Sequence, residues 1–109
     1  MRYLFLICIA PDVELTPENA AVGPWLEEMT DRKARVLGDR IRPNSDATTV
    51  RVRDGEVLVS DGPFAETREH IGGFDVIECA DLDEAIEIAS KHPIAKYGTI
   101  DIRPVWPMP

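Results

Sequence analysis

The sequence has few of the residues that carry metal, disulfide or phosphate chemistry. It contains two cysteines, Cys8 and Cys79, which lie far apart and form neither a disulfide framework nor a spaced zinc motif. Each lies in an apolar run, so we interpret both as reduced thiols that pack as small hydrophobes. No glycine-rich phosphate loop, serine triad or metal-binding constellation is present. We therefore expect no metal and no cofactor.

Long apolar runs are also missing. The apolar run near the N-terminus, residues 3–9, is too short to cross a bilayer and is followed by Pro11-Asp12 rather than by a small-residue cleavage site. We interpret this run as a buried strand. We expect a cytoplasmic protein that does not enter a membrane.

Positive charge is scarce. The chain has 12 Lys and Arg against 20 Asp and Glu, which gives a formal net charge of −8. Nucleic-acid binders usually present a basic stripe that displaces counterions from phosphates, whereas the basic residues here alternate with acidic ones, as in Asp31-Arg32-Lys33. We therefore predict that the chain binds neither nucleic acid nor an anionic membrane surface.

The sequence otherwise has the composition of a small folded domain. Its 109 residues, of which 44% are hydrophobic, fit one domain over residues 1–109, and no repeat or linker divides them. A chain this short buries only a modest fraction of its unfolded surface, so its stability margin is narrow. A second copy would supply the missing burial.

The first half predicts a strand, a long helix and a short strand. Residues 2–9 are nearly all apolar, which suits a central strand. Thr16 followed by a proline and a glutamate is a good helix start, and Gly38 is a natural end, so we predict a helix over residues 16–37. Its apolar stripe is Val22, Trp25, Leu26 and Met29. A short strand is expected over residues 39–42.

The second half begins with a hairpin. Residues 48–53 and 56–60 are β-rich, and they are joined by Asp54-Gly55, a strong signal for a two-residue turn. Residues 61–71 contain turn formers and charges without a strand period. A further apolar strand is expected over residues 74–79.

A second helix and a last strand complete the chain. Asp81 and Glu84 have the spacing of a capping box, and His92-Pro93 ends the helix. Residues 99–103 alternate apolar and polar side chains, as a strand with one buried face does. Without the hairpin, the order is βαββαβ, so we predict a ferredoxin-like α+β fold with an inserted β-hairpin.

This fold has a consequence for assembly. Two helices cover only one face of a four-stranded sheet, and the other face needs a partner. A second copy of the sheet is the simplest one, so we predict a homodimer that packs face to face.

Several motifs in the C-terminal half occur together and in a fixed order. They are Val50-Arg51-Val52-Arg53-Asp54-Gly55, Asp61-Gly62-Pro63-Phe64-Ala65-Glu66-Thr67, Gly72-Gly73-Phe74, Asp81-Leu82-Asp83-Glu84-Ala85, His92-Pro93 and Arg103-Pro104-Val105. On these residues the chain resembles the DGPF branch of the YCII-related proteins. The resemblance implies a dimeric α/β barrel. It also implies an association with the genes of alternative sigma factors.

One better understood YCII-like group contains a dehydrochlorinase that is thought to use a His–Asp pair. Its histidine lies early in the first helix, and its aspartate precedes the proline that ends the second helix. This sequence has no histidine near Trp25, and His92 stands before Pro93. That pair does not carry over to this chain.

Five residues are candidates for a site. His92 and Asp61 are the acid–base pair that we would test for catalysis, because histidine titrates near neutrality and Asp61 belongs to a loop that can face a cleft. As structural alternatives, His92 caps the end of a helix and Asp61 caps a turn. Arg103 either binds a substrate carboxylate or pairs with Glu66 or Asp101. Phe64 and Glu66 join Arg103 as candidate substrate contacts.

Three functions fit this sequence. The chain is a cofactor-independent enzyme that performs proton abstraction or elimination on a small aromatic or carboxylate compound. Alternatively, it is a non-catalytic module that binds a small molecule and takes part in sigma-factor-linked regulation. In the third case it is a dimer that binds another protein.

Overall fold

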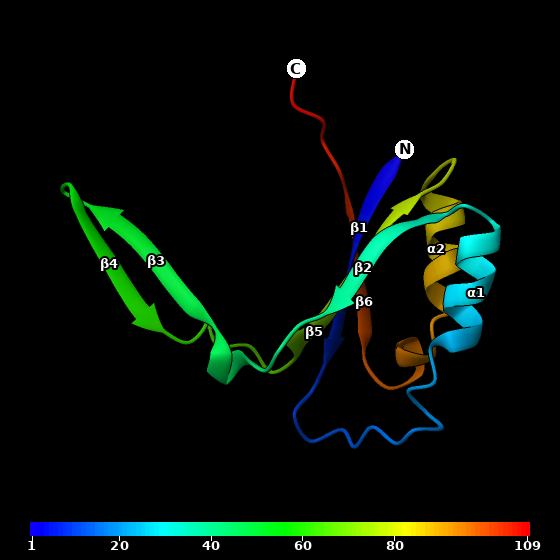
Figure 1. Ribbon diagram of the computed structural model, residues 1–109, viewed down its shortest axis with the longest axis horizontal. Helices are drawn as coiled ribbons and strands as arrows, with labels where there is room; N and C mark the ends of the chain where they lie inside the picture. Colours follow the sequence, from blue (N-terminus) through cyan, green and yellow to red (C-terminus); the bar gives the residue numbers. More distant parts are fainter.

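The computed structural model describes residues 1–109, and its elements follow the predicted order. A four-stranded antiparallel sheet has the order β2-β5-β1-β6, with both long helices on one face (Figure 1). This arrangement confirms the ferredoxin-like α+β fold. The elements of this body are β1 (Arg2–Ile9), α1 (Gly23–Asp31), β2 (Arg35–Arg40), β5 (His70–Glu78), α2 (Leu82–Ser90), the 3₁₀ helix η2 (Pro93–Lys96) and β6 (Thr99–Pro104).

The core lies between the sheet and the two helices. The odd-numbered side chains of β1, from Tyr3 to Ile7, are buried on the helix side, as the alternation of a strand requires. Trp25 and Met29 of α1 are buried against them, as the sequence predicts. The Trp25 indole Nε1 donates a hydrogen bond to the Ile88 carbonyl at 3.0 Å, which ties α1 to α2.

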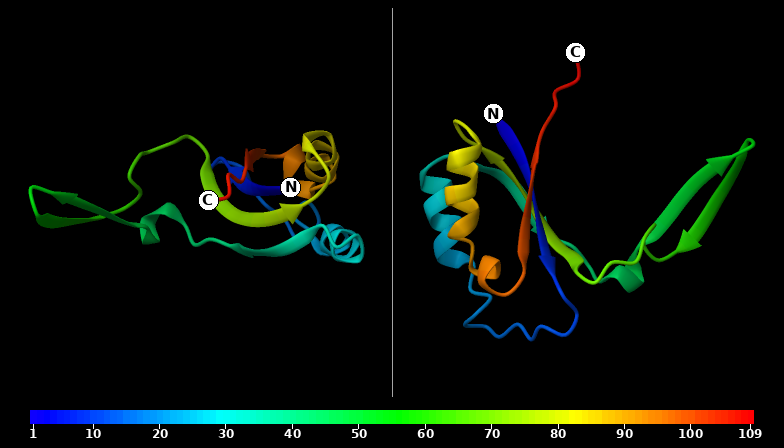
Figure 2. Two further views of the ribbon diagram at one scale, coloured as in Figure 1. Left: turned by 90° about the horizontal axis from the view of Figure 1, so that it is seen from above. Right: turned by 180° about the vertical axis from the view of Figure 1, so that it is seen from behind.

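The predicted hairpin is present as β3 (Thr48–Arg53) and β4 (Glu56–Asp61), which we call the arm, residues 48–61. Asp54 and Gly55 have φ of 51° and 79°, the left-handed values that a two-residue hairpin turn needs. The short helix η1 (Asn44–Asp46) precedes the arm. The arm projects away from the body on the side of the sheet opposite the helices (Figure 2).

The predicted opening of the second helix is also confirmed. Asp81 Oδ1 accepts a hydrogen bond from the Glu84 amide at 2.9 Å, and Glu84 Oε1 accepts one from the Ala80 amide at 2.9 Å. These two bonds satisfy amides at the start of α2 that no helical carbonyl reaches. The local sequence therefore determines where this helix begins.

The prediction of a first helix over residues 16–37 is wrong at both ends. Thr16 and Asn19 bond each other reciprocally and close a single turn, and the helix begins only at Gly23. Pro24 has no amide donor and therefore fits the first turn of a helix, not its interior. The helix ends at Asp31 because Lys33 adopts a left-handed φ of 55° and the Ala34 amide returns to the Met29 carbonyl at 2.9 Å.

Two strands therefore differ from their predicted bounds. β2 occupies Arg35–Arg40 rather than residues 39–42, because the chain turns out of the helix at Lys33 and not at Gly38. β5 begins at His70 rather than Phe74, because Ile71 and the glycines after it pair with β1 across a register shift. No helix has the length and apolar character needed to cross a membrane.

Gly38 offers a test of the packing between β2 and β5. A Cβ at this position would overlap Asp75 Oδ1 and would lie 2.6 Å from Arg35 Nη2. We expect Gly38→Ala to lower the free energy of unfolding by about 1–3 kcal/mol, the usual effect of overpacking. The control is Gly23→Ala, where a Cβ meets nothing within 4 Å. Urea denaturation measures both, and equal stability of the two variants would contradict this packing.

Candidate functional site

A cavity of about 420 Å³ lies between the helix layer and the sheet. Its walls come from β1, β2 and β5, from α1 and the segment before it, and from η2. Its volume is in the range of about 300–1,000 Å³ that is typical of small-molecule sites. Most of the lining is apolar, with Ile7, Ile9, Leu15, Val22 and Leu26 among the residues. We call this cavity the cleft.

Three glycines line the cleft, Gly38 of β2 and Gly72 and Gly73 of β5. At Gly38 the place of a side chain is taken by Asp75 and Arg35. At Gly73 a Cβ would lie 3.0 Å from the Asp39 carbonyl oxygen, which is closer than ordinary packing permits. The two strands therefore approach each other closely at the point where the cleft opens.

Asp75 places a carboxylate on the helix side of β5, where its neighbours are apolar. Only 6% of its surface is exposed, and its Oδ1 accepts a hydrogen bond from Arg35 Nε at 2.7 Å. Burial raises the pKa of Asp75 above its ordinary value, and the Arg35 guanidinium opposes this only in part. The carboxylate is therefore a stronger base than an exposed aspartate, and it lines the cleft.

His92 contributes a second polar group. Its Nδ1 accepts a hydrogen bond from the Ile94 amide at 3.1 Å, and its ring meets Trp25 edge-on with centroids 4.7 Å apart. Burial lowers the pKa of His92 to about 4, so the ring is neutral at physiological pH. Because an amide can only donate, Nδ1 must be unprotonated, and the proton of the neutral ring is on Nε2.

The Nε2–H of His92 is the donor that the cleft offers to a ligand. His92 lines the cleft, and no side-chain nitrogen or oxygen that is fully buried lacks a partner. The only hydrogen bond of this ring within the chain uses Nδ1. Nε2 is therefore free to donate, and His92 cannot accept a proton there. In this geometry His92 donates a hydrogen bond, and of the two carboxylates that line the cleft, Asp39 and Asp75, only Asp75 is buried.

The structure separates His92 from Asp61 within one chain. Asp61 is the last residue of β4 and is exposed at the base of the arm, and it does not line the cleft. Glu66 is likewise exposed and outside the cleft. The assignment of catalytic roles to His92 and Asp61 stays a prediction that no geometry within one chain supports.

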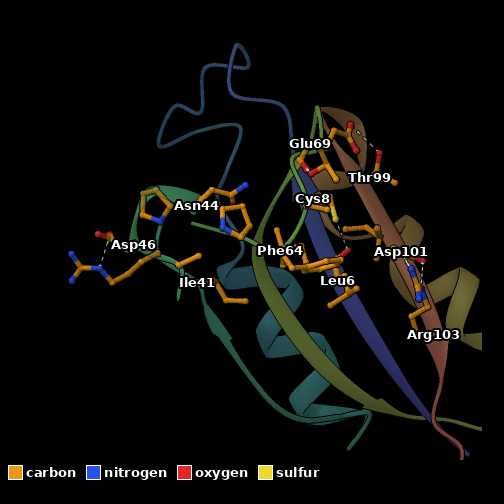
Figure 3. A pocket seen from close by; sticks show the side chains of 18 of the residues that line it. Leu6, Cys8, Ile41, Asn44, Asp46, Phe64, Glu69, Thr99, Asp101 and Arg103 are labelled. Atoms are coloured by element: carbon orange, nitrogen blue, oxygen red, sulfur yellow. Dashed lines mark hydrogen bonds and ion pairs between the residues drawn. The ribbon is translucent and has the colours of Figure 1, made fainter. Parts of the chain in front are cut away.

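Phe64 and Arg103 line a different region, an open hollow of about 1270 Å³ between the sheet and the base of the arm that also reaches Leu82 and Ile86 of α2 (Figure 3). Arg103 donates three hydrogen bonds to Asp101, the closest at 2.8 Å, so its ion pair is with Asp101 and not with Glu66. The Phe64 side chain is 81% exposed. Burial raises the pKa of the Cys8 thiol, which also lines the hollow.

No metal centre is formed. No three His, Cys, Asp or Glu side chains come together in a way that would hold a metal ion. Both cysteines are free thiols.

Sequence reasoning missed Arg35 and Asp75. The signal was present, because Asp75 interrupts the apolar run from Phe74 to Cys79, and an acidic side chain inside a central strand needs a buried partner. That partner, Arg35, was hidden by the expectation that residues 16–37 are helical. The correct strand places it beside Asp75.

Two comparisons with known proteins agree with this fold. The family model of the YCII-related domain matches residues 1–109. An uncharacterized protein of Rhizobium meliloti (strain 1021) is 44% identical over 68 residues, which are 61% of this chain and 55% of that protein. The chain thus aligns with little more than half of this relative's length.

The buried neutral state of His92 predicts a pH dependence of stability. The pKa is 6.5 in an exposed histidine and about 4 in the fold, so between these values the unfolded chain binds a proton that the folded chain does not. The contribution of His92 to the free energy of unfolding is therefore constant above pH 6.5, and it falls as the pH drops toward 4. The loss approaches about 3 kcal/mol.

The control is His92→Asn, whose side-chain oxygen can still accept the Ile94 amide but does not titrate. The difference in unfolding free energy between the two proteins, measured by urea denaturation at several pH values, isolates His92 from Asp75. A difference that does not change with pH would contradict the buried, neutral imidazole.

Proposed function

The chain belongs to the YCII-related family, and we propose that it binds a small organic molecule in the cleft and transfers a proton there with Asp75, without a cofactor. The observation that carries this proposal is that a buried donor and a buried acceptor line the same cavity beside apolar side chains. His92 Nε2–H is the donor, and the Asp75 carboxylate is the acceptor. Membership of the DGPF branch stays a prediction.

The lining indicates the class of ligand. Apolar side chains surround most of the cleft, which favours an aromatic or aliphatic body. The His92 donor favours a carbonyl or carboxylate oxygen on that body. The cleft is lined by two arginines, Arg35 and Arg40, and by two aspartates, Asp39 and Asp75, so its charges balance and it does not demand a strongly anionic ligand.

The proposed step is proton abstraction beside a carbonyl group. The Asp75 carboxylate takes the proton from carbon, and the electron pair of the C–H bond moves onto the carbonyl oxygen. The resulting oxyanion accepts a hydrogen bond from His92 Nε2–H. A neutral donor in a dry site stabilises this charge more strongly than the same donor does in water. Return of the proton from Asp75 to the same carbon completes the step and restores the carbonyl group.

Binding without turnover is the second candidate, and one observation favours it. Arg35 Nε donates a hydrogen bond of 2.7 Å to Asp75 Oδ1. This bond engages one oxygen of the carboxylate and opposes its uptake of a proton. A cleft of this kind would serve a ligand sensor, including the sigma-factor-linked regulator that the family resemblance suggests. Such a sensor would bind the same chemical class.

Two further expectations accompany the proposal. We propose that the chain is a homodimer, because α1 and α2 leave one face of the sheet uncovered within one copy. We also propose a cytoplasmic location, which two free thiols favour.

The two candidates are separated by hydrogen exchange on a ligand. Small aryl ketones and aromatic 2-oxo acids are first screened for an increase in Tm, and each hit is incubated with the protein in D₂O. We expect proton NMR to show deuterium at the carbon beside the carbonyl group. Asp75→Asn should slow this incorporation by about 10²–10⁴-fold, the usual contribution of a general base, and should retain binding.

Asp61→Asn is the matched control, since it makes the same chemical change outside the cleft. Incorporation that survives in Asp75→Asn and is lost in Asp61→Asn would reject Asp75 in favour of Asp61. Hits that bind the wild-type chain without any incorporation would establish the binding module instead.

A further inference from the structure

The arm has an apolar face that nothing in its own chain covers. Its valines form two directly opposed cross-strand pairs, Val50 with Val59 and Val52 with Val57. Their exposed fractions are 59%, 64%, 57% and 67% in that order. Because strand side chains alternate, all four point to the same face of the ribbon. The opposite face carries Arg51 and Leu58 among its residues.

The arm makes the chain less compact than its length predicts. A compact domain of this length has a radius of gyration of about 13 Å. The observed value is 15.9 Å, and the principal extents are 48 × 42 × 18 Å. β3 and β4 form a sheet of their own and pair with no strand of the body. An isolated two-stranded ribbon is marginally stable in water, so a projecting arm with an apolar face requires a partner.

The helix-free face of the sheet is the second uncovered surface. Leu4 and Leu6 of β1 lie beside Val76 and Phe74 of β5 on this face, and all four are only half-buried. Most charges on the face are already paired, and the exception is Asp39 of β2, which lies beside Phe74 and forms no ion pair. Arg2 bonds Glu78 at 3.3 Å, and Arg103 bonds Asp101 at 2.8 Å. The face therefore presents little net charge, and two copies can approach through it although each chain carries −8.

The hollow joins these two surfaces. It is lined by Leu6 and Arg103 of the sheet face and also by Thr48 and Thr49 at the base of the arm (Figure 3). At about 1270 Å³ it is larger than the roughly 300–1,000 Å³ of a typical small-molecule pocket. It is open on the side from which the arm projects, so its size and position suit a protein surface.

We propose that the valine face of the arm docks on a second copy of this chain, so that the arm of each copy packs on the other copy while their helix-free faces meet. We call this exchange of arms the clasp. The partner must itself lack a cover for an apolar surface and must tolerate a nearly neutral face. A second copy satisfies both requirements, and a two-fold axis lets the same surfaces serve both copies. The clasp rests on the proposed dimer and adds the element that holds it.

The test compares two faces of one ribbon. Val57→Asp places a charge on the valine face, and Leu58→Asp places the same charge on the neighbouring residue of the opposite face. Light scattering over a range of micromolar concentrations gives the mass of each protein. We expect the wild type and Leu58→Asp at twice the chain mass of 12.2 kDa. Val57→Asp should shift to 12.2 kDa, with the dimer weakened about tenfold or more.

A further variant controls for unfolding of the hairpin by the substitution at Val57. Val57→Thr keeps a β-branched side chain and introduces no charge, so the ribbon is retained, and it should weaken the dimer less than Val57→Asp does. If Val57→Asp and Leu58→Asp both remain at twice the chain mass, the clasp is overturned and the dimer stands. A wild-type chain that is monomeric at every concentration would overturn the proposed dimer and the clasp together. Neither result would bear on the cleft.

Discussion

The buried ion pair between Arg35 and Asp75 is the interaction on which the other features depend. A carboxylate inside an apolar strand is tolerated only with a partner, and β2 supplies that partner from the neighbouring strand. The pair occupies the position where a side chain at residue 38 would stand, so that residue is glycine. The pair and the glycines Gly38, Gly72 and Gly73 line the cleft together.

The two faces of the sheet thus have different roles. On the helix side, the cleft contains an acceptor, Asp75, and a donor, His92. Burial raises the pKa of Asp75 and lowers the pKa of His92. On the other side, the apolar strands and the valine face of the arm remain uncovered within one copy. Two helices are too few to cover both faces, and this constraint accounts for the expected partner.

Most of the fold could be predicted from local sequence, and much of the site could not. The Asp54-Gly55 turn and the Asp81–Glu84 cap depend on neighbouring residues, so the sequence shows them directly. The end of α1 depends on the left-handed conformation of Lys33, which the residue type does not predict. That error hid β2 and with it Arg35. Asp61 is a candidate from the sequence because it begins a recognisable motif. The raised pKa of Asp75 comes only from burial in the folded chain, which the sequence does not show.

The basicity of Asp75 can be measured by carbon-13 NMR titration of its side-chain carboxyl group. We expect a midpoint above the ordinary value of 3.8, because burial outweighs the Arg35 hydrogen bond. A midpoint at or below 3.8 would mean that the ion pair dominates. Asp75 would then serve to hold β2 against β5, and the cleft would have no base for proton transfer.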